Sequence, residues 1–211
     1  DVGKVNKKIQ KLEEEERVKE EAADNRSVSE KFADCLILGD SITQGLYEYG
    51  VLDEANVQAD RGTEVSEVSS KKIEEHIKKA KEMKPEVLFL AYGMNDIEAQ
   101  NGNASGFVKA YKNVIEDLKE SLPDTKIYVN CILPAAQSAI ETRPLFANVP
   151  KFNQKLKKLC KKEKVTFIDN TDLVKQEYYA DDGIHMSPSY YTKWVDHMAE
   201  AAAVSYTHLT L

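Results

Sequence analysis

The chain lacks long hydrophobic runs. None of its apolar stretches approaches the ~18 residues of a membrane-spanning helix, and no positively charged start followed by an apolar core marks a signal peptide. Because the sequence begins at Asp1 rather than at a methionine, the lack of a leader here does not argue against one upstream. A removed signal, or a membrane anchor before Asp1, therefore stays among the expectations.

Cysteine is also scarce. Cys35, Cys131 and Cys160 cannot all pair within one chain, and their spacings match neither a zinc site nor a redox Cys-x-x-Cys motif. Cys35 and Cys131 fall in predicted strands, where a free cysteine behaves as a small buried hydrophobic residue. The sequence therefore predicts structural thiols rather than a disulfide framework or a metal centre.

Positive charge is not in excess. The chain has 29 Lys and Arg against 36 Asp and Glu, which gives a net charge of -7. Binding to nucleic-acid phosphates depends on clusters of Lys and Arg, whereas the lysines of this chain alternate with acids. We therefore expect no nucleic-acid partner.

The chain does contain enough apolar residues for one globular domain. Its 211 residues are 42% hydrophobic, so a sizeable core can form. Residues 1–31 differ from the rest because they are almost entirely charged or alanine. Within them, Val2, Val5, Ile9 and Leu12 form a helical stripe that is too short for a confident coiled coil. This extension is either a stalk or a dimerising helix, or a solvated helix or tail.

Between Phe32 and Val204, short apolar runs alternate with amphipathic helices. That alternation predicts a three-layer α/β/α domain with a parallel sheet and right-handed crossovers. Residues 205–211 carry no helical period, and we expect them to be an appended, unstructured tail. The expected strands are 33–39, 55–59, 87–91, 126–133 and 165–168, and the expected helices are 63–84, 105–122, 151–164 and 187–204.

The stretch that organises the domain is residues 36–45, LILGDSITQG. A buried strand there ends in Gly-Asp-Ser, and ligands of parallel sheets bind beyond the carboxyl ends of the strands. Ser41 is therefore expected at the mouth of a crevice. Taken alone, the same residues would equally suit a plain turn with a helix N-cap.

A base for this serine is predicted in a late loop. Serine is a weak nucleophile unless a base takes its proton, and a histidine oriented by a carboxylate is the usual solution. Asp182 and His185 are three positions apart just before a predicted helix, so the carboxylate can reach the imidazole from the same turn. The other histidines, His76, His197 and His208, are interpreted as surface turn residues.

Donors for an oxyanion are predicted in two further loops. The negative oxygen formed during acyl transfer needs N–H groups aimed at it in advance. The Ser41 and Gly62 backbone N–H groups and the Asn95 side-chain amide supply three candidates. Each segment alone has an ordinary explanation as a polar loop, and their occurrence together after predicted strands favours a serine hydrolase.

These segments resemble the four sequence blocks of the SGNH hydrolases, also called the GDSL-type esterase and lipase superfamily. The matching residues are Gly-Asp-Ser-Ile-Thr-x-Gly at 39–45, Gly62, Gly-x-Asn-Asp at 93–96 and Asp-x-x-His at 182–185. The resemblance spans residues 32–204 and implies a flavodoxin-like five-stranded parallel sheet in the order 2-1-3-4-5. It also implies a metal-free serine hydrolase without a cofactor. One departure is Met186-Ser187, where many members carry Pro and Asn.

By the same resemblance, each candidate residue takes a role in catalysis. Ser41 is the nucleophile, His185 the base and Asp182 the acid that orients it, with Ser41, Gly62 and Asn95 as the oxyanion hole. The expected function is that of an esterase that removes short acyl groups, above all acetyl, from a carbohydrate or another small ester.

Substrate contacts are predicted at Asp40, Tyr47, Arg143 and Tyr179, because they flank the candidate site or lie in the loops beside it. Asp40 has a second interpretation, as a brace of the turn, and each tyrosine has one too, in core packing or in a surface patch. The chain lacks the long apolar lid segment that would suggest a long-chain lipase.

Two other classes of function stay open besides the esterase. The same triad would serve an O-acyltransferase, a lysophospholipase or a thioesterase, and a binding module with a vestigial site is a third class. A charged stalk before an esterase domain favours a secreted or cell-envelope protein of bacterial type over a cytoplasmic one.

Overall fold

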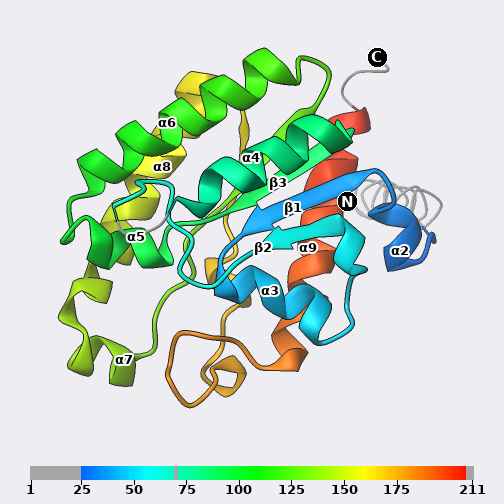
Figure 1. Ribbon diagram of the computed structural model, residues 1–211. Helices are drawn as coiled ribbons and strands as arrows, with labels where there is room; N and C mark the ends of the chain where they lie inside the picture. The colour runs from blue at the N-terminus through cyan, green and yellow to red at the C-terminus, as the bar shows by residue number, and fades with distance from the viewer. Residues whose placement is uncertain (1–24, 69–70, 208–211) are drawn as a thin grey trace, which may run out of the picture.

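A five-stranded parallel sheet forms the centre of the domain (Figure 1). The structure is a computed structural model that describes residues 25–68 and 71–207. The strand order β2-β1-β3-β4-β5 confirms the predicted flavodoxin-like topology. The strands are β1 (Cys35–Gly39), β2 (Val57–Ala59), β3 (Val87–Ala91), β4 (Lys126–Asn130) and β5 (Thr166–Ile168).

The sheet is buried on both faces, as its continuous apolar runs predict. All five residues of β1 are buried, and so are four of the five in β3. The two strands pair in parallel register, with Ile37 opposite Phe89 and Gly39 opposite Ala91. Because β1 lies between β2 and β3, its carboxyl end has a neighbouring strand on each side.

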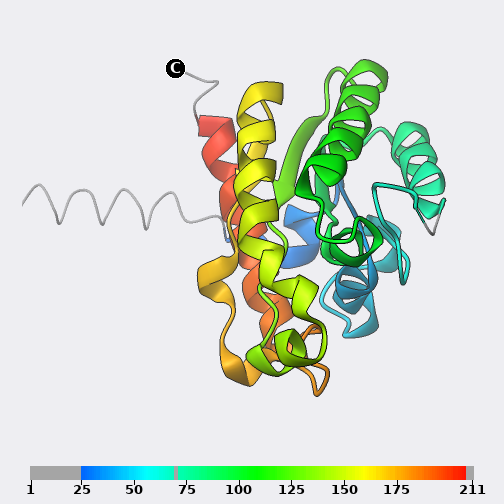
Figure 2. The same cartoon turned by 90° about the vertical axis from the view of Figure 1, so that its left-hand side faces the viewer.

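Helices cover both faces of the sheet (Figures 1 and 2). On one face α6 (Ala104–Ser121) packs against both α4 (Lys72–Met83) and α8 (Val149–Glu163), and on the other α3 (Ser41–Glu48) packs against α9 (Pro188–Thr207). This arrangement confirms the three-layer α/β/α fold. Short helices complete it: α2 (Val28–Lys31), α5 (Met94–Ala99), α7 (Gln137–Thr142) and the 3-10 turns η1 (Glu54–Asn56), η2 (Pro144–Asn148), η3 (Thr171–Leu173) and η4 (Gln176–Tyr178).

Most expected elements differ from the observed ones by one to three residues, and two of the differences have a clear physical cause. The helix expected over 63–84 begins only at Lys72. The Ser66 N–H donates to the Asp96 carboxylate, and Glu67 has φ +50°, which lies outside the right-handed helical region. The strand expected over 126–133 ends at Asn130. Beyond it, the backbone N–H and C=O of Ile132 both bond to the side chain of Asn153, at 2.8 and 2.7 Å.

Two helices lie partly outside the range 32–204 that was expected for the domain. Helix α2 lies before Phe32, carries a capping box between Ser27 and Glu30, and packs against α9. Helix α9 continues to Thr207, three residues beyond the expected end at Val204. The rest of the predicted extension, residues 1–24, and the last four residues of the predicted tail lie outside the described residues. Within the described part of the chain, no helix combines the length and apolarity needed to cross a membrane.

The three cysteines are free and buried, as predicted. Burial raises the pKa of each thiol to about 12. The thiolate form, which is the reactive one, is therefore scarce at neutral pH. These residues contribute to packing, and Cys131 also lines the small cavity next to Ser41 that is described below.

Candidate active site

Ser41 stands on a sharp turn between β1 and α3. The preceding residue, Asp40, is the N-cap of α3, and its side chain accepts a hydrogen bond from the Ile42 N–H at 3.0 Å. Gly39 is required here, because a Cβ at this position would lie 1.9 Å from Thr43 Oγ1. The turn places Ser41 in the first position of the helix, at the carboxyl edge of the sheet.

His185 reaches Ser41 from the loop before α9. The distance between His185 Nε2 and Ser41 Oγ is 2.8 Å, although the two residues are 144 positions apart. On the other side of the ring, His185 Nδ1 lies 2.5 Å from Asp182 Oδ2. The carboxylate can only accept, so Nδ1 carries the proton and Nε2 of the neutral ring is free to accept one from the serine.

Asp182 is held by its own turn. Its Oδ1 accepts from the backbone N–H groups of Ile184 and His185, both at 2.9 Å. Burial alone would raise the pKa of Asp182, but the hydrogen bonds from the His185 ring and from these two N–H groups lower it below its usual value. The residue is therefore ionised at neutral pH, as the orienting partner of a histidine base must be.

The site is open to solvent. The side chains of Asp182 and His185 are 47% and 42% exposed, and Ser41 is half-buried. The nearby cavity lined by Asp40 and Ile42, which flank Ser41, has a volume of only about 20 Å³. That is room for about one water molecule, so this cavity does not extend into a long apolar channel.

Segment 134–139, which includes the start of α7, buttresses the catalytic loop. The Ala136 N–H donates to the Gly183 carbonyl at 2.8 Å, and the Tyr179 hydroxyl donates to the Pro134 carbonyl at 2.9 Å. Gly183 has φ +68°, and a Cβ on it would lie 3.0 and 3.1 Å from the Cβ atoms of Ala136 and Ala139. Glycine therefore allows the loop both its left-handed conformation and its close approach to α7.

Gly183→Ala is expected to lower kcat for ester hydrolysis by about tenfold or more. The added methyl group strains the backbone and presses on α7, which moves the imidazole away from Ser41, and a shift of about 1 Å can cost ~100-fold. Steady-state kinetics on a soluble ester would measure this loss of kcat. Gly50→Ala is the matched control, since Gly50 also has positive φ but a Cβ added to it would meet nothing within 4 Å. Equal kcat in the Gly183 variant and the wild type would contradict this role.

The two other predicted oxyanion-hole residues lie on a loop and in a helix that follow the two strands next to β1 in the sheet. Gly62 has φ +76° in the exposed loop after β2, and Asn95 lies in the first turn of α5. Asn95 Nδ2 donates to the Thr63 carbonyl at 3.1 Å and lies 3.5 Å from Asp40 Oδ2. The side-chain amide thus ties the loop of Gly62 to the turn of Ser41, and its role as an oxyanion donor stays a prediction.

Asp96 has a role that the sequence did not reveal. It is fully buried, and its two carboxylate oxygens accept from the Val65 and Ser66 N–H groups at 3.2 and 2.9 Å. Burial raises its pKa to about 6 in spite of these bonds. Its position inside the Gly-x-Asn-Asp motif was the available signal, because a carboxylate next to a helix start is well placed to bind the backbone of a neighbouring loop.

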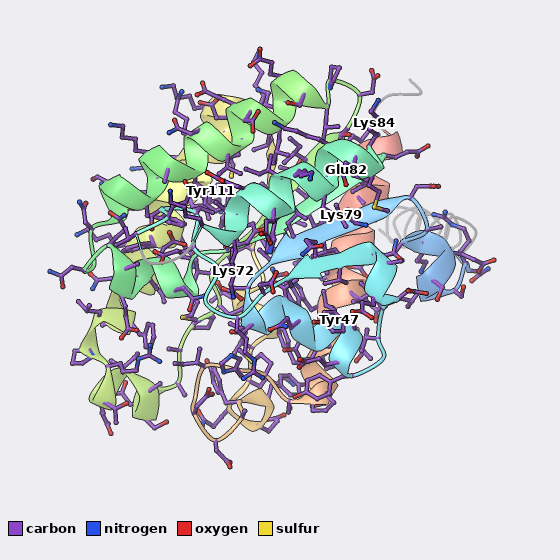
Figure 3. The ribbon with its side chains drawn as sticks, viewed as in Figure 1. Tyr47, Lys72, Lys79, Glu82, Lys84 and Tyr111 are labelled. Atoms are coloured by element: carbon purple, nitrogen blue, oxygen red, sulfur yellow. The ribbon has the colours of Figure 1, made fainter. Side chains whose placement is uncertain are left out.

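The four predicted substrate-contact residues have partners within the protein. Asp40 is only 3% exposed, and burial raises its pKa to about 7, so its described role is the brace of the turn. The Tyr47 hydroxyl accepts from Gln44 on α3 (Figure 3). Arg143 pairs with Glu98 and stacks on Phe146 at 4.5 Å. Tyr47, Arg143 and Tyr179 keep substrate contact as a prediction.

The interpretation of His76 as a surface residue is wrong. His76 lies in α4 and is fully buried. The signal for this burial was its spacing, because Ile73, His76, Ile77 and Ala80 lie on one helical face. His197 is half-buried in α9, where its ring bonds to Asn170 at 2.9 Å, and His208 lies outside the described residues.

A larger hollow lies at the opposite end of the sheet. It has a volume of about 280 Å³ and is lined by residues at the amino ends of β1 and β3, among them Cys35 and Val87. Ligands of parallel sheets bind at the carboxyl ends of the strands. The hollow is thus separate from the site around Ser41.

Comparisons with known proteins concern the family and the fold of the chain. A model described as the GDSL-like Lipase/Acylhydrolase family matches residues 37–193. No curated protein sequence matches the chain.

Solved structures with the same fold come from several organisms. A GDSL-like lipase from Bacteroides thetaiotaomicron is 16% identical with a TM-score of 0.61, over 92% of this chain and 97% of that one. A carbohydrate esterase family 3 protein from Talaromyces cellulolyticus is 17% identical with a TM-score of 0.59, over 83% and 96%. A mutant of an acetyl-xylooligosaccharide esterase from Geobacillus Stearmophilus is 15% identical with a TM-score of 0.55, over 81% and 93%. At these identities the likeness shows the fold alone.

Proposed function

Since the chain belongs to the GDSL-like lipase/acylhydrolase family, we propose that it is a serine esterase for short acyl esters, most specifically acetyl esters on a carbohydrate. The observation that carries the proposal is the continuous hydrogen-bonded chain from Ser41 through His185 to Asp182, with distances of 2.8 and 2.5 Å. A serine bonded to a histidine, with the histidine bonded to a carboxylate, is the arrangement that activates a serine as a nucleophile.

The first half of the reaction acylates the serine. Ser41 Oγ attacks the ester carbonyl while His185 Nε2 takes the hydroxyl proton, and Asp182 stabilises the imidazolium that forms. The carbonyl oxygen becomes an oxyanion, for which the Ser41 and Gly62 N–H groups and the Asn95 amide are the proposed donors. As the carbon–oxygen bond to the alcohol breaks, His185 returns the proton to the leaving oxygen.

The second half releases the acid. A water molecule loses a proton to His185 and attacks the acyl carbon, and the oxyanion forms again in the same place. Collapse breaks the bond to Ser41 Oγ, which recovers its proton from His185. The net reaction consumes one ester and one water and yields one alcohol and one carboxylic acid, with the protein unchanged.

The open site and the small cavity support a short acyl group on a bulky alcohol. A half-exposed histidine and aspartate leave room for a large alcohol at the protein surface, such as a sugar chain. The cavity lined by the neighbours of Ser41, at about 20 Å³, has no room for a long acyl chain, and neither Ser41 nor His185 lines it. The names of two structural neighbours, a carbohydrate esterase and an acetyl-xylooligosaccharide esterase, point to the same substrate class.

A panel of p-nitrophenyl esters from two to twelve acyl carbons, together with acetylated xylo-oligosaccharides, tests this proposal. We expect kcat/KM to be highest for acetate and to fall as the acyl chain lengthens, because each added methylene that finds no room loses binding energy in the transition state. A maximum at eight carbons or more would refute the short-chain assignment. Acyl transfer to an added sugar or lipid faster than to water would instead favour a transferase.

A further inference from the structure

A second histidine and aspartate pair lies behind the loop that carries Gly62. His76 on α4 is fully buried, and its ring bonds on both sides: Nε2 lies 2.9 Å from Asp60 Oδ2, and Nδ1 lies 2.6 Å from the Tyr92 hydroxyl. Tyr92 is also buried, at 2% exposure, just after β3. These three residues are absent from the reaction described above.

The directions of these two hydrogen bonds follow from the groups involved. The Asp60 carboxylate can only accept, so His76 Nε2 carries the proton and donates. A neutral ring then leaves Nδ1 as an acceptor for the Tyr92 hydroxyl. Burial lowers the pKa of His76, although Asp60 and Glu75 favour its charged form, and this agrees with a neutral ring.

Asp60 begins the turn that leads to Gly62. Its carbonyl accepts from the Thr63 N–H at 3.2 Å and from Thr63 Oγ1 at 2.8 Å, and its N–H donates to the Gly39 carbonyl at 3.3 Å. The turn that contains Gly62 therefore spans residues 60–63. Because His76 fixes the Asp60 side chain, it also limits the rotation of this turn against β1.

Helix α4 holds the turn at a second point. Lys72, one helical turn before His76, donates from Nζ to the Arg61 carbonyl at 2.8 Å (Figure 3). Since residues four apart lie on the same helical face, α4 presents both donors to residues 60–61. Helix α5 holds the following residues of the loop: Asn95 donates to the Thr63 carbonyl, and Asp96 accepts from the N–H groups of residues 65 and 66.

We propose that Tyr92, His76 and Asp60 are positioning residues that hold the Gly62 N–H where the oxyanion of the ester reaction forms. The inference rests on the proposed function, because it needs Gly62 as an oxyanion donor. His76 and Asp60 do not have to touch substrate, and Tyr92 acts through His76, although it also lines the small cavity next to Ser41. They act by keeping the exposed loop around Gly62 rigid, so that the donor does not have to be reoriented at the moment of reaction.

His76→Leu tests the proposal by kinetics. We expect kcat on p-nitrophenyl acetate to fall about 10- to 100-fold, with KM changed less than about twofold, since a misplaced donor affects the transition state more than the bound ester. His76→Gln is expected to recover most of the lost kcat, because its amide nitrogen can replace Nε2 as a donor to Asp60. Ile73→Val is the matched control, a buried change on the same helix that lowers stability without removing a polar contact.

Amide hydrogen exchange of Thr63, whose N–H donates to the Asp60 carbonyl within the turn, tests the proposal independently of catalysis. We expect faster exchange at this amide in His76→Leu, and near wild-type exchange in His76→Gln and Ile73→Val. Unchanged kcat and unchanged exchange in His76→Leu would overturn the positioning role while leaving the esterase assignment intact. If the wild-type protein hydrolyses no ester, the proposed function fails, and the exchange rates decide by themselves whether His76 holds the loop.

Discussion

Ser41→Ala is expected to reduce kcat for p-nitrophenyl acetate hydrolysis by about 10⁴-fold or more, to the level set by the remaining binding groups. The substitution removes the oxygen atom placed 2.8 Å from His185 Nε2 to attack the ester. The fold should survive, because Ser41 is half-buried and its side-chain contact lies at the edge of the domain. Initial rates and a circular dichroism melt would measure the two effects separately.

The companion variants test whether Ser41 and His185 act as a unit. His185→Ala is expected to cost nearly as much as Ser41→Ala, and the double variant no more than either one, because a nucleophile without its base is as inactive as a base without its nucleophile. Ser189→Ala is the matched control, an exposed serine in the first turn of α9. Losses in the single variants that add up in the double variant would contradict a shared step.

Asn95→Ala is expected to lower kcat by about 100- to 1000-fold, the usual cost of one lost oxyanion donor, with a smaller change in KM. The negative charge develops only as the ester carbonyl is attacked, so the lost hydrogen bond weakens the transition state and not the ground state. Steady-state kinetics with an acetyl ester would separate the two constants.

Asn113→Ala serves as its control, because Asn113 is exposed on α6. Part of the Asn95 effect would come through Thr63, whose carbonyl accepts from the same amide at 3.1 Å. A variant with unchanged kcat and a raised KM would place Asn95 in substrate binding and remove it from the oxyanion hole.

The sheet could be predicted from the sequence because its strands are continuous apolar runs. Residues 87–91 coincide with β3, and the end of β1 at Gly39 was also expected. The start of α4 could not be predicted. Val65 is buried as the helical pattern suggested, but the N–H of the next residue, Ser66, donates to a distant carboxylate, that of Asp96. A periodic pattern records burial and carries no information on such a long-range partner.

The convergence of the site was predictable for a similar reason. Ser41, Asp182 and His185 each follow a strand or precede a helix at the same edge of a parallel sheet, so topology brings them together. The hydrogen bonds of His76 behind the site were not predictable in the same way. His76 pairs with Asp60 and Tyr92 only because α4 and β3 meet the loop after β2, and no local motif joins these residues.

The most direct test of the esterase mechanism is to locate the site of covalent labelling by a fluorophosphonate probe, by mass spectrometry of the intact protein and of its peptides. We predict one adduct per chain, on Ser41, that is lost in Ser41→Ala and forms much more slowly in His185→Ala. The absence of an adduct in the wild-type protein, or an adduct that persists in Ser41→Ala, would contradict the mechanism.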